Sequence, residues 1–198
     1  MATLAATAAP KLSEMSEGTK AEKSRNEIDK IIKQAGQFYQ DMADTEGRGR
    51  FPGQSKYNVQ VGGAPYVNTD ATSSGTTTAL ANALAHNQAI LADLKLHGTG
   101  DGWQQYDDTP TNAWISVFGI VEGTGADAYA GAGVSDCDDC SAEWLPLFGD
   151  EVLASQFQDG HYAYSVVAGG GSGNDVFPPV LYVVDVENAV DFNSVLEP

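Results

Sequence analysis

The stretch Glu151-Val-Leu-Ala-Ser-Gln-Phe-Gln-Asp-Gly-His-Tyr-Ala-Tyr-Ser-Val-Val-Ala168 places Asp159-Gly160 between two runs that contain apolar residues. An Asp-Gly pair here favours a two-residue type I′ turn, because both central residues of that turn need a positive φ. The stretch therefore predicts a β-hairpin in which Ser155 faces Tyr164 and Leu153 faces Val166. Its expected core face carries Leu153, Phe157, Tyr162, Tyr164 and Val166. Its other face, expected to be half-exposed, carries Val152, Ala154, Gln156, Gln158, His161, Ala163, Ser165 and Val167.

Further β structure is expected on both sides of this hairpin. Residues 113–121 and 180–186 are continuous apolar runs, which predict two central strands. A short helical turn is expected over 141–148, a flexible Gly-rich segment over 168–175, and a last short strand or turn over 189–196. No helix of crossover length separates the strands after residue 110, so the sheet is expected to be antiparallel.

Two helices are expected ahead of this β region. Thr19 and Glu22 fit a capping box, which predicts a helix over about 20–43. Its narrow apolar seam consists of Ile28, Ile31, Ala35, Phe38 and Met42. Through this seam the helix is expected to dock either on its own domain or on another copy of the chain. A second helix is expected over 76–97, ending before Gly98. Leucines form its main stripe, and its many alanines make it slim enough for a buried or intersubunit position: Leu80, Leu84, Leu91 and Leu94.

These elements predict the α+β class, with two N-terminal helices followed by a C-terminal antiparallel β domain. That domain is expected to be sandwich-like or jelly-roll-like, with four or five strands. The expected organisation is a flexible arm (1–18), a helical extension (19–44), an extended connection (45–75), and a helix plus antiparallel β domain (76–198). A connection this long is uncommon in a compact domain. It is either an arm that lies on a neighbour, a functional loop, or the site of an unrecognised strand, for which 57–61 is the candidate.

The charge distribution argues against two classes of partner. The chain has 27 acidic and 10 basic residues, a formal net charge of −17, and only Lys95 is basic after Lys56. Nucleic acids and anionic membrane surfaces need clustered Lys and Arg, so neither partner is expected. No apolar run is long enough to span a membrane, so no membrane span is expected. The N-terminus lacks the basic start and continuous apolar core of a signal peptide, so none is predicted.

Cys137-Asp-Asp-Cys140 is the most conspicuous candidate for chemistry. Three aspartates surround the thiols, which disfavours the lowered thiol pKa that redox catalysis needs. A zinc site needs four ligands, and the histidines that could complete one are scattered singly: His86, His97 and His161. The sequence therefore favours two structural thiols or a local disulfide.

The acidic residues Asp101, Asp107 and Asp108 are weak candidates for a Ca²⁺ site. Their spacing is not that of an EF-hand, so a solvated acidic surface is the favoured interpretation. The chain contains no nucleophile elbow, metalloprotease helix motif or phosphate-binding loop. Neither a cofactor nor an enzymatic activity is predicted.

Arms, long connections and helices with unpaired apolar faces are typical of subunits that reach their neighbours. The sequence therefore favours a structural, self-assembling subunit whose partners are copies of itself and other subunits. A virus particle component (capsid, decoration or tail protein), assembled in the host cytoplasm, is the favoured example. The expected interface consists of Ile28, Ile31, Ala35, Phe38, Met42, Leu84 and Leu91. The alternative is a β-domain binding module for a glycan or protein, possibly with Ca²⁺ at the loop 103–108.

Overall fold

The computed structural model of the chain describes residues 5–61, 76–96, 114–119, 140–157, 162–172 and 174–198. Its helices are α1 (Ala5–Glu46), α2 (Thr76–Leu96), α4 (Cys140–Trp144) and the short 3₁₀ helices η1 (Leu145–Phe148) and η2 (Val186–Asn188). Its strands are β1 (Ile115–Ser116), β2 (Tyr162–Val167), β3 (Gly170–Ser172), β4 (Asp175–Phe177), β5 (Val180–Asp185) and β6 (Asn193–Leu196).

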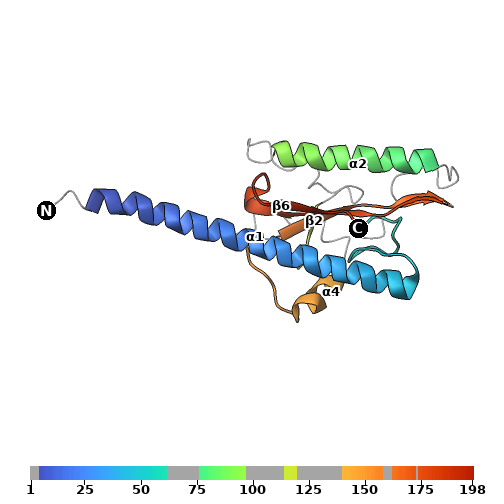
Figure 1. Cartoon of the computed structure of the whole chain (residues 1–198), viewed down its shortest axis with the longest axis horizontal. Helices are drawn as coiled ribbons and strands as arrows, with labels where there is room; N and C mark the ends of the chain where they lie inside the picture. The colour runs from blue at the N-terminus through green and yellow to red at the C-terminus, as the bar shows by residue number, and fades with distance from the viewer. Residues whose placement is uncertain (1–4, 62–75, 97–113, 120–139, 158–161, 173) are drawn as a thin grey trace.

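A four-stranded antiparallel sheet lies between two helices. The strand order is β1-β2-β5-β6, and β3 pairs with β4 in a separate two-stranded sheet. Helix α1 lies on one side of the four-stranded sheet and α2 on the other (Figure 1). The α+β class is therefore confirmed, with two helices ahead of an antiparallel sheet. In the described part of the chain, helices rather than a second stacked sheet cover the two faces of this sheet.

The predicted hairpin is wrong in its first arm. Residues 162–167 form β2, but both edges of β2 are taken by other strands, with Ile115 opposite Tyr164 on one side and Val183 opposite Tyr164 on the other. Residues 151–157 form no strand. Ser155, expected opposite Tyr164, instead donates a hydrogen bond from Oγ to Asp185 Oδ2 at 2.6 Å. The Asp159-Gly160 turn and His161 lie outside the described residues.

The expected core face of this stretch is correct even though the pairing is not. Tyr162, Tyr164 and Val166 are buried in one cluster, and Leu153 and Phe157 pack against it while partly buried. The expectation that the opposite face is half-exposed is wrong for β2, because all six of its residues are buried. Burial on both faces makes β2 a central strand, and α2 covers the face that was expected to be half-exposed.

The other β expectations have mixed outcomes. Strand β5 is central, as predicted, and the last short strand is confirmed as β6. The expected central strand 113–121 is wrong for the described residues 114–119, in which Ile115 and Ser116 form the short strand β1 at the end of the strand order. The expected helical turn is confirmed by α4 and η1. The Gly-rich segment 168–175, expected to be flexible, contributes β3 and the first residue of β4.

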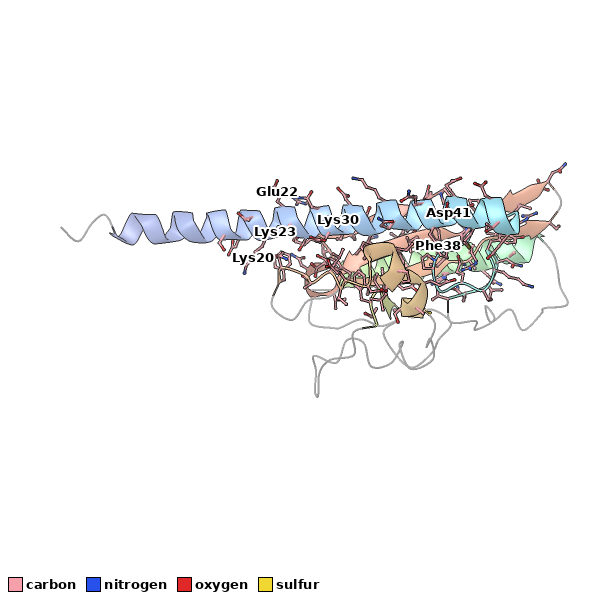
Figure 2. The ribbon with its side chains drawn as sticks, turned by 90° about the horizontal axis from the view of Figure 1, so that it is seen from below. Lys20, Glu22, Lys23, Lys30, Phe38 and Asp41 are labelled. Atoms are coloured by element: carbon pink, nitrogen blue, oxygen red, sulfur yellow. The ribbon has the colours of Figure 1, made fainter. Side chains whose placement is uncertain are left out.

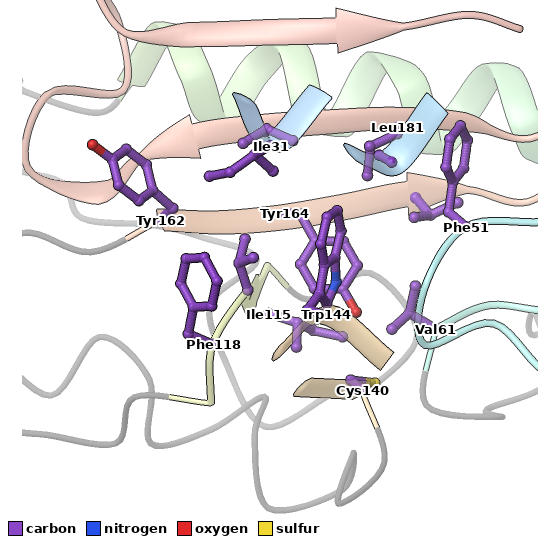
Figure 3. Close-up of a cluster of buried hydrophobic side chains, with 14 of the residues drawn as sticks. Ile31, Phe51, Val61, Ile115, Phe118, Cys140, Trp144, Tyr162, Tyr164 and Leu181 are labelled. Carbon is purple, nitrogen blue, oxygen red and sulfur yellow. The ribbon is translucent and has the colours of Figure 1, made fainter. Parts of the chain in front are cut away.

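The larger core cluster lies between α1 and the sheet. From α1 it contains Ile28, Ile31 and Ala35, which pack with Leu181, Val183 and the β2 residues named above. Trp144 of α4 lies against Tyr164, with ring centroids 5.2 Å apart and tilted by 70° (Figure 3). Offset and edge-on aromatic contacts of this kind add to the stabilisation from apolar burial. Helix α1 is thus part of the core and brings its seam to the sheet of its own chain.

Helix α1 begins earlier than its sequence pattern predicts. It already runs from Ala5, so the predicted start at about Lys20 is wrong. Alanine has the highest helix propensity, which favours helix across Ala5 to Ala9 and offsets part of the cost of Pro10 inside the helix. The N-terminal part of α1 extends beyond the sheet (Figure 1). The division into arm, extension, connection and β domain stays a prediction.

The described part of the connection, residues 47–61, packs on α4. Arg50 Nη1 lies 2.9 Å from Glu143 Oε1 and donates to the Gln54 carbonyl oxygen at 2.8 Å. The Gly53 amide donates to Glu143 Oε2 at 2.7 Å. Buried Gln54 accepts from the Phe51 amide at 2.8 Å, so its side chain holds the loop closed. The possible strand 57–61 contributes one isolated bridge, between Gln54 and Val61.

Candidate interaction surface

Helix α2 has two apolar faces, and only one of them is buried. Ala83, Ile90 and Leu94 are buried against β2 and β5. On another face of the helix, Leu80, Leu84 and Leu91 are 45%, 52% and 41% exposed. Alanines and one glutamine share that exposed face. We call it the α2 outer face, and it consists of Leu80, Ala81, Leu84, Ala85, Gln88, Leu91 and Ala92.

Polar contacts to the rest of the chain fix which face of α2 points inward. His86 Nδ1 lies 3.0 Å from Gln60 Nε2, and His86 Nε2 lies 3.5 Å from Ser165 Oγ. Asn87 Oδ1 accepts a hydrogen bond from the Tyr182 hydroxyl. Buried polar groups need partners, so rotating α2 to bury its leucines would break these contacts. The leucines of the outer face therefore stay exposed while α2 is docked.

The small side chains of α2 explain how closely it docks. A Cβ atom added at Gly170 of β3 would lie 3.0 Å from Ala79 Cβ. Ala79 thus lies close to Gly170, and a larger side chain at either position would not fit without a shift of its neighbours. The single leucine stripe expected from the sequence divides in the structure, because Leu94 is buried while Leu80, Leu84 and Leu91 are exposed.

His86 and Ser165 resemble a base and nucleophile, but their burial gives them another role. A serine beside a histidine can be activated for attack on a substrate. Here Ser165 and His86 are 2% and 3% exposed, so the pair packs inside the protein. Burial lowers the pKa of His86 to about 4, and the imidazole is therefore neutral at pH 7. We assign this pair to the attachment of α2.

The predicted interface residues differ in how far the structure buries them. Ile28, Ile31 and Ala35 are buried in the chain's own core, so they are not exposed to a second copy. Phe38 and Met42 are partly buried, and Figure 2 shows Phe38 on the side of α1 that faces α4. Arg50 lies over the Phe38 ring, 5.2 Å from its centroid. Of the seven predicted interface residues, only Leu84 and Leu91 are exposed in the described structure.

Five members of the α2 outer face are not among the interface residues predicted from the sequence: Leu80, Ala81, Ala85, Gln88 and Ala92. The available signal was the Leu-Ala pair repeated at residues 80, 84 and 91 on one side of the helix. That pattern predicts one leucine stripe for a buried or intersubunit position, and periodicity alone does not separate the buried Leu94 from the exposed leucines.

A second exposed feature is the projecting part of α1. Residues 16–20 are all exposed, and among the α1 residues whose burial is described, from residue 16 onward, packing against the core cluster begins at Ala21. Charged side chains follow the exposed side of the helix further along, including Glu22, Lys30 and Asp41 (Figure 2). Short helices without tertiary contacts are marginal in water, so a partner would stabilise this segment.

The candidate metal ligands are not brought together in the described structure. Asp101, Asp107, Asp108 and Cys137 lie outside the described residues, as does the loop 103–108. Cys140 is disulfide-bonded, so it offers no thiolate to zinc, and Cys137 is the other cysteine of the sequence. Among the described residues, no group of three or more His, Cys, Asp or Glu side chains could hold a metal ion.

Comparison of the chain with protein-family models, curated proteins and solved structures finds no match. Of the helices in the described ranges, none has the length and apolar character that crossing a bilayer requires.

Proposed function

We propose that this chain is a structural subunit that assembles with copies of itself. The observation that carries the proposal is the α2 outer face, on which three leucines are each more than two-fifths exposed. Exposed apolar patches rimmed by polar residues are typical of protein–protein contact sites. The polar contacts of His86 and Asn87 hold this face outward, so its exposure is built into the docking of α2.

Charge supports the choice of this face. Between Ala79 and Lys95 the only charged side chains are Asp93, which is buried, and Lys95. Elsewhere the chain is strongly acidic, and two copies with a formal charge of −17 each repel one another. An uncharged apolar face is where that repulsion opposes contact least. The projecting part of α1 gives the subunit a second means of reaching a neighbour.

Among assemblies, we propose a virus particle component, as a capsid, decoration or tail protein. This narrower choice follows from the sequence-based hypothesis. The described structure supports the broader class through its exposed helical surfaces.

The solution mass of the full chain, measured by light scattering at low and high salt, tests the proposal. We expect a discrete oligomer or larger particle that becomes more stable with salt, because salt screens repulsion between acidic copies. A monomer at both salt concentrations, up to several hundred micromolar chain, would overturn it.

A further inference from the structure

The α2 outer face has an internal symmetry that specifies how it pairs. Leu84-Ala85 precedes Gln88 by four and three residues, and Leu91-Ala92 follows it by three and four. If two such helices run antiparallel with Gln88 opposite Gln88, Leu84 of one copy meets Ala92 of the other. Leu91 likewise meets Ala85. In this register Leu84 and Leu91 therefore each face an alanine, which is how packed helices interdigitate, while Leu80 is opposite Leu96 at the end of the contact.

We infer that the α2 outer face binds the same face of a second copy, antiparallel, about a two-fold axis at Gln88. This inference rests on the proposed self-assembly and specifies its first contact. A two-fold contact uses one patch on both subunits, so it closes a dimer. The antiparallel arrangement also places opposite ends of the two helix dipoles together.

Gln88 has a defined role in this arrangement. It is the polar member of the α2 outer face and sits at the symmetry centre, where its amide can both donate to and accept from its equivalent. A single buried amide pair fixes the register of paired helices, because any shift leaves both amides without partners.

The charge on the helix selects a second copy over a charged partner. Lys95 is the one exposed charged residue in the 79–95 segment of α2, and the pairing places it opposite Ala81 at the margin of the contact. A basic partner would find no complementary group on this face, and an acidic partner would find only Lys95 at its margin, since the face itself consists of Leu, Ala and Gln. A second copy presents the same uncharged surface.

Engineered cysteines test the register in the full chain. Gln88→Cys is expected to form a covalent dimer under mild oxidation with copper–phenanthroline, as judged on a non-reducing gel. Leu84→Cys alone is not expected to do so, because its equivalent lies about eight residues along the helix, or roughly 12 Å away. That separation exceeds the roughly 7 Å limit between Cα atoms of a disulfide. A mixture of Leu84→Cys and Ala92→Cys chains is expected to cross-link.

Leu84→Glu tests the contact itself. We expect at least a tenfold rise in the dimer dissociation constant, measured by sedimentation, with an unchanged thermal transition of the diluted chain. The matched control is Val152→Glu, a residue 48% exposed beside Leu153, which packs on the α1 side of the sheet. It adds the same charge at similar exposure and is expected to leave the dimer unchanged.

The outcomes separate this inference from the broader proposal. If the wild-type chain assembles but Gln88→Cys does not cross-link, or Leu84→Glu has no effect, the two-fold contact is wrong and self-assembly stands. If Leu84→Cys cross-links with itself, the helices are not in the inferred register. If Leu84→Glu weakens assembly while Gln88→Cys stays uncross-linked, another segment of a neighbouring copy occupies the face. A wild-type chain that stays monomeric overturns both.

Discussion

His86 makes the stability of the fold depend on pH. Its pKa is lowered to about 4 by burial, against about 6.5 for an exposed histidine. The unfolded chain therefore takes up a proton at a pH where the folded chain does not. The contribution of neutral His86 to stability is fully present above about pH 6.5 and is lost as the pH falls toward 4. The full loss corresponds to about 3 kcal/mol.

Replacing the histidine isolates this effect. We expect His86→Gln to be less stable than wild type at pH 7, because the contacts with Gln60 and Ser165 are altered. The difference should shrink or reverse between pH 6.5 and 4, since glutamine takes up no proton. Urea unfolding of both chains at several pH values measures it. Parallel stability curves would mean that His86 titrates alike in the folded and unfolded chains.

Gly53 is held where a side chain does not fit. Its φ is +83°, and an added Cβ would lie 2.5 Å from Tyr164 Oη and 2.9 Å from Cys140 Sγ. We expect Gly53→Ala to lower the free energy of unfolding by about 2–4 kcal/mol, through backbone strain plus crowding. Gly47→Ala is the control, because Gly47 has a φ of +79° with open space around its Cβ position. Equal losses for the two variants, measured by denaturant unfolding, would show that the Gly53 contacts contribute nothing.

At the level of elements, the sequence specifies those whose signals are local. The predicted bounds of helix α2 and strand β5 agree with the structure nearly to their ends. An amphipathic or apolar run bounded by Gly or Pro is enough to predict such an element from the local sequence. The hairpin failed because a turn signal says nothing about competing strands. Tyr164 pairs with Ile115 and Val183, which are distant from it in the sequence, so a short-range pattern cannot predict those pairings.

The candidate surface was only half predictable for the same reason. The α1 seam and the α2 leucines have equally apolar patterns, yet Ile31 is buried and Leu84 is exposed. Both helices bury an apolar face against the sheet, and the contacts of His86 and Asn87 fix which face of α2 is the buried one. Those polar contacts join residues far apart in the chain, so periodicity alone could not find them.

Paired truncations of these two helices test that difference. We expect Ile31→Ala to lower the free energy of unfolding by about 2–5 kcal/mol, because it leaves a cavity in the core. Leu84→Ala should change it by less than about 0.5 kcal/mol in dilute protein, since an exposed side chain loses little burial. Denaturant unfolding at low chain concentration measures both. A small effect of Ile31→Ala would mean that α1 does not stabilise the sheet.

For the whole molecule, the arrangement divides α1 into a supporting part and a projecting part. The supporting part carries Ile28, Ile31 and Ala35 into the core, while residues 16–20 are exposed. The two-fold pairing that we propose through α2 would close a dimer without using the projecting parts of α1. We therefore expect any growth beyond the dimer to depend on those projecting helices.

Two deletions distinguish the roles of these parts. Removing residues 1–18 is expected to leave the thermal unfolding of the chain unchanged and to retain the dimer, while larger particles disappear from light scattering. Removing residues 1–44 is expected to abolish cooperative unfolding, because three buried core side chains are lost with the helix. A folded chain lacking residues 1–44 would make α1 a dispensable extension. Larger particles that persist without residues 1–18 would mean that growth beyond the dimer uses a surface on the folded body.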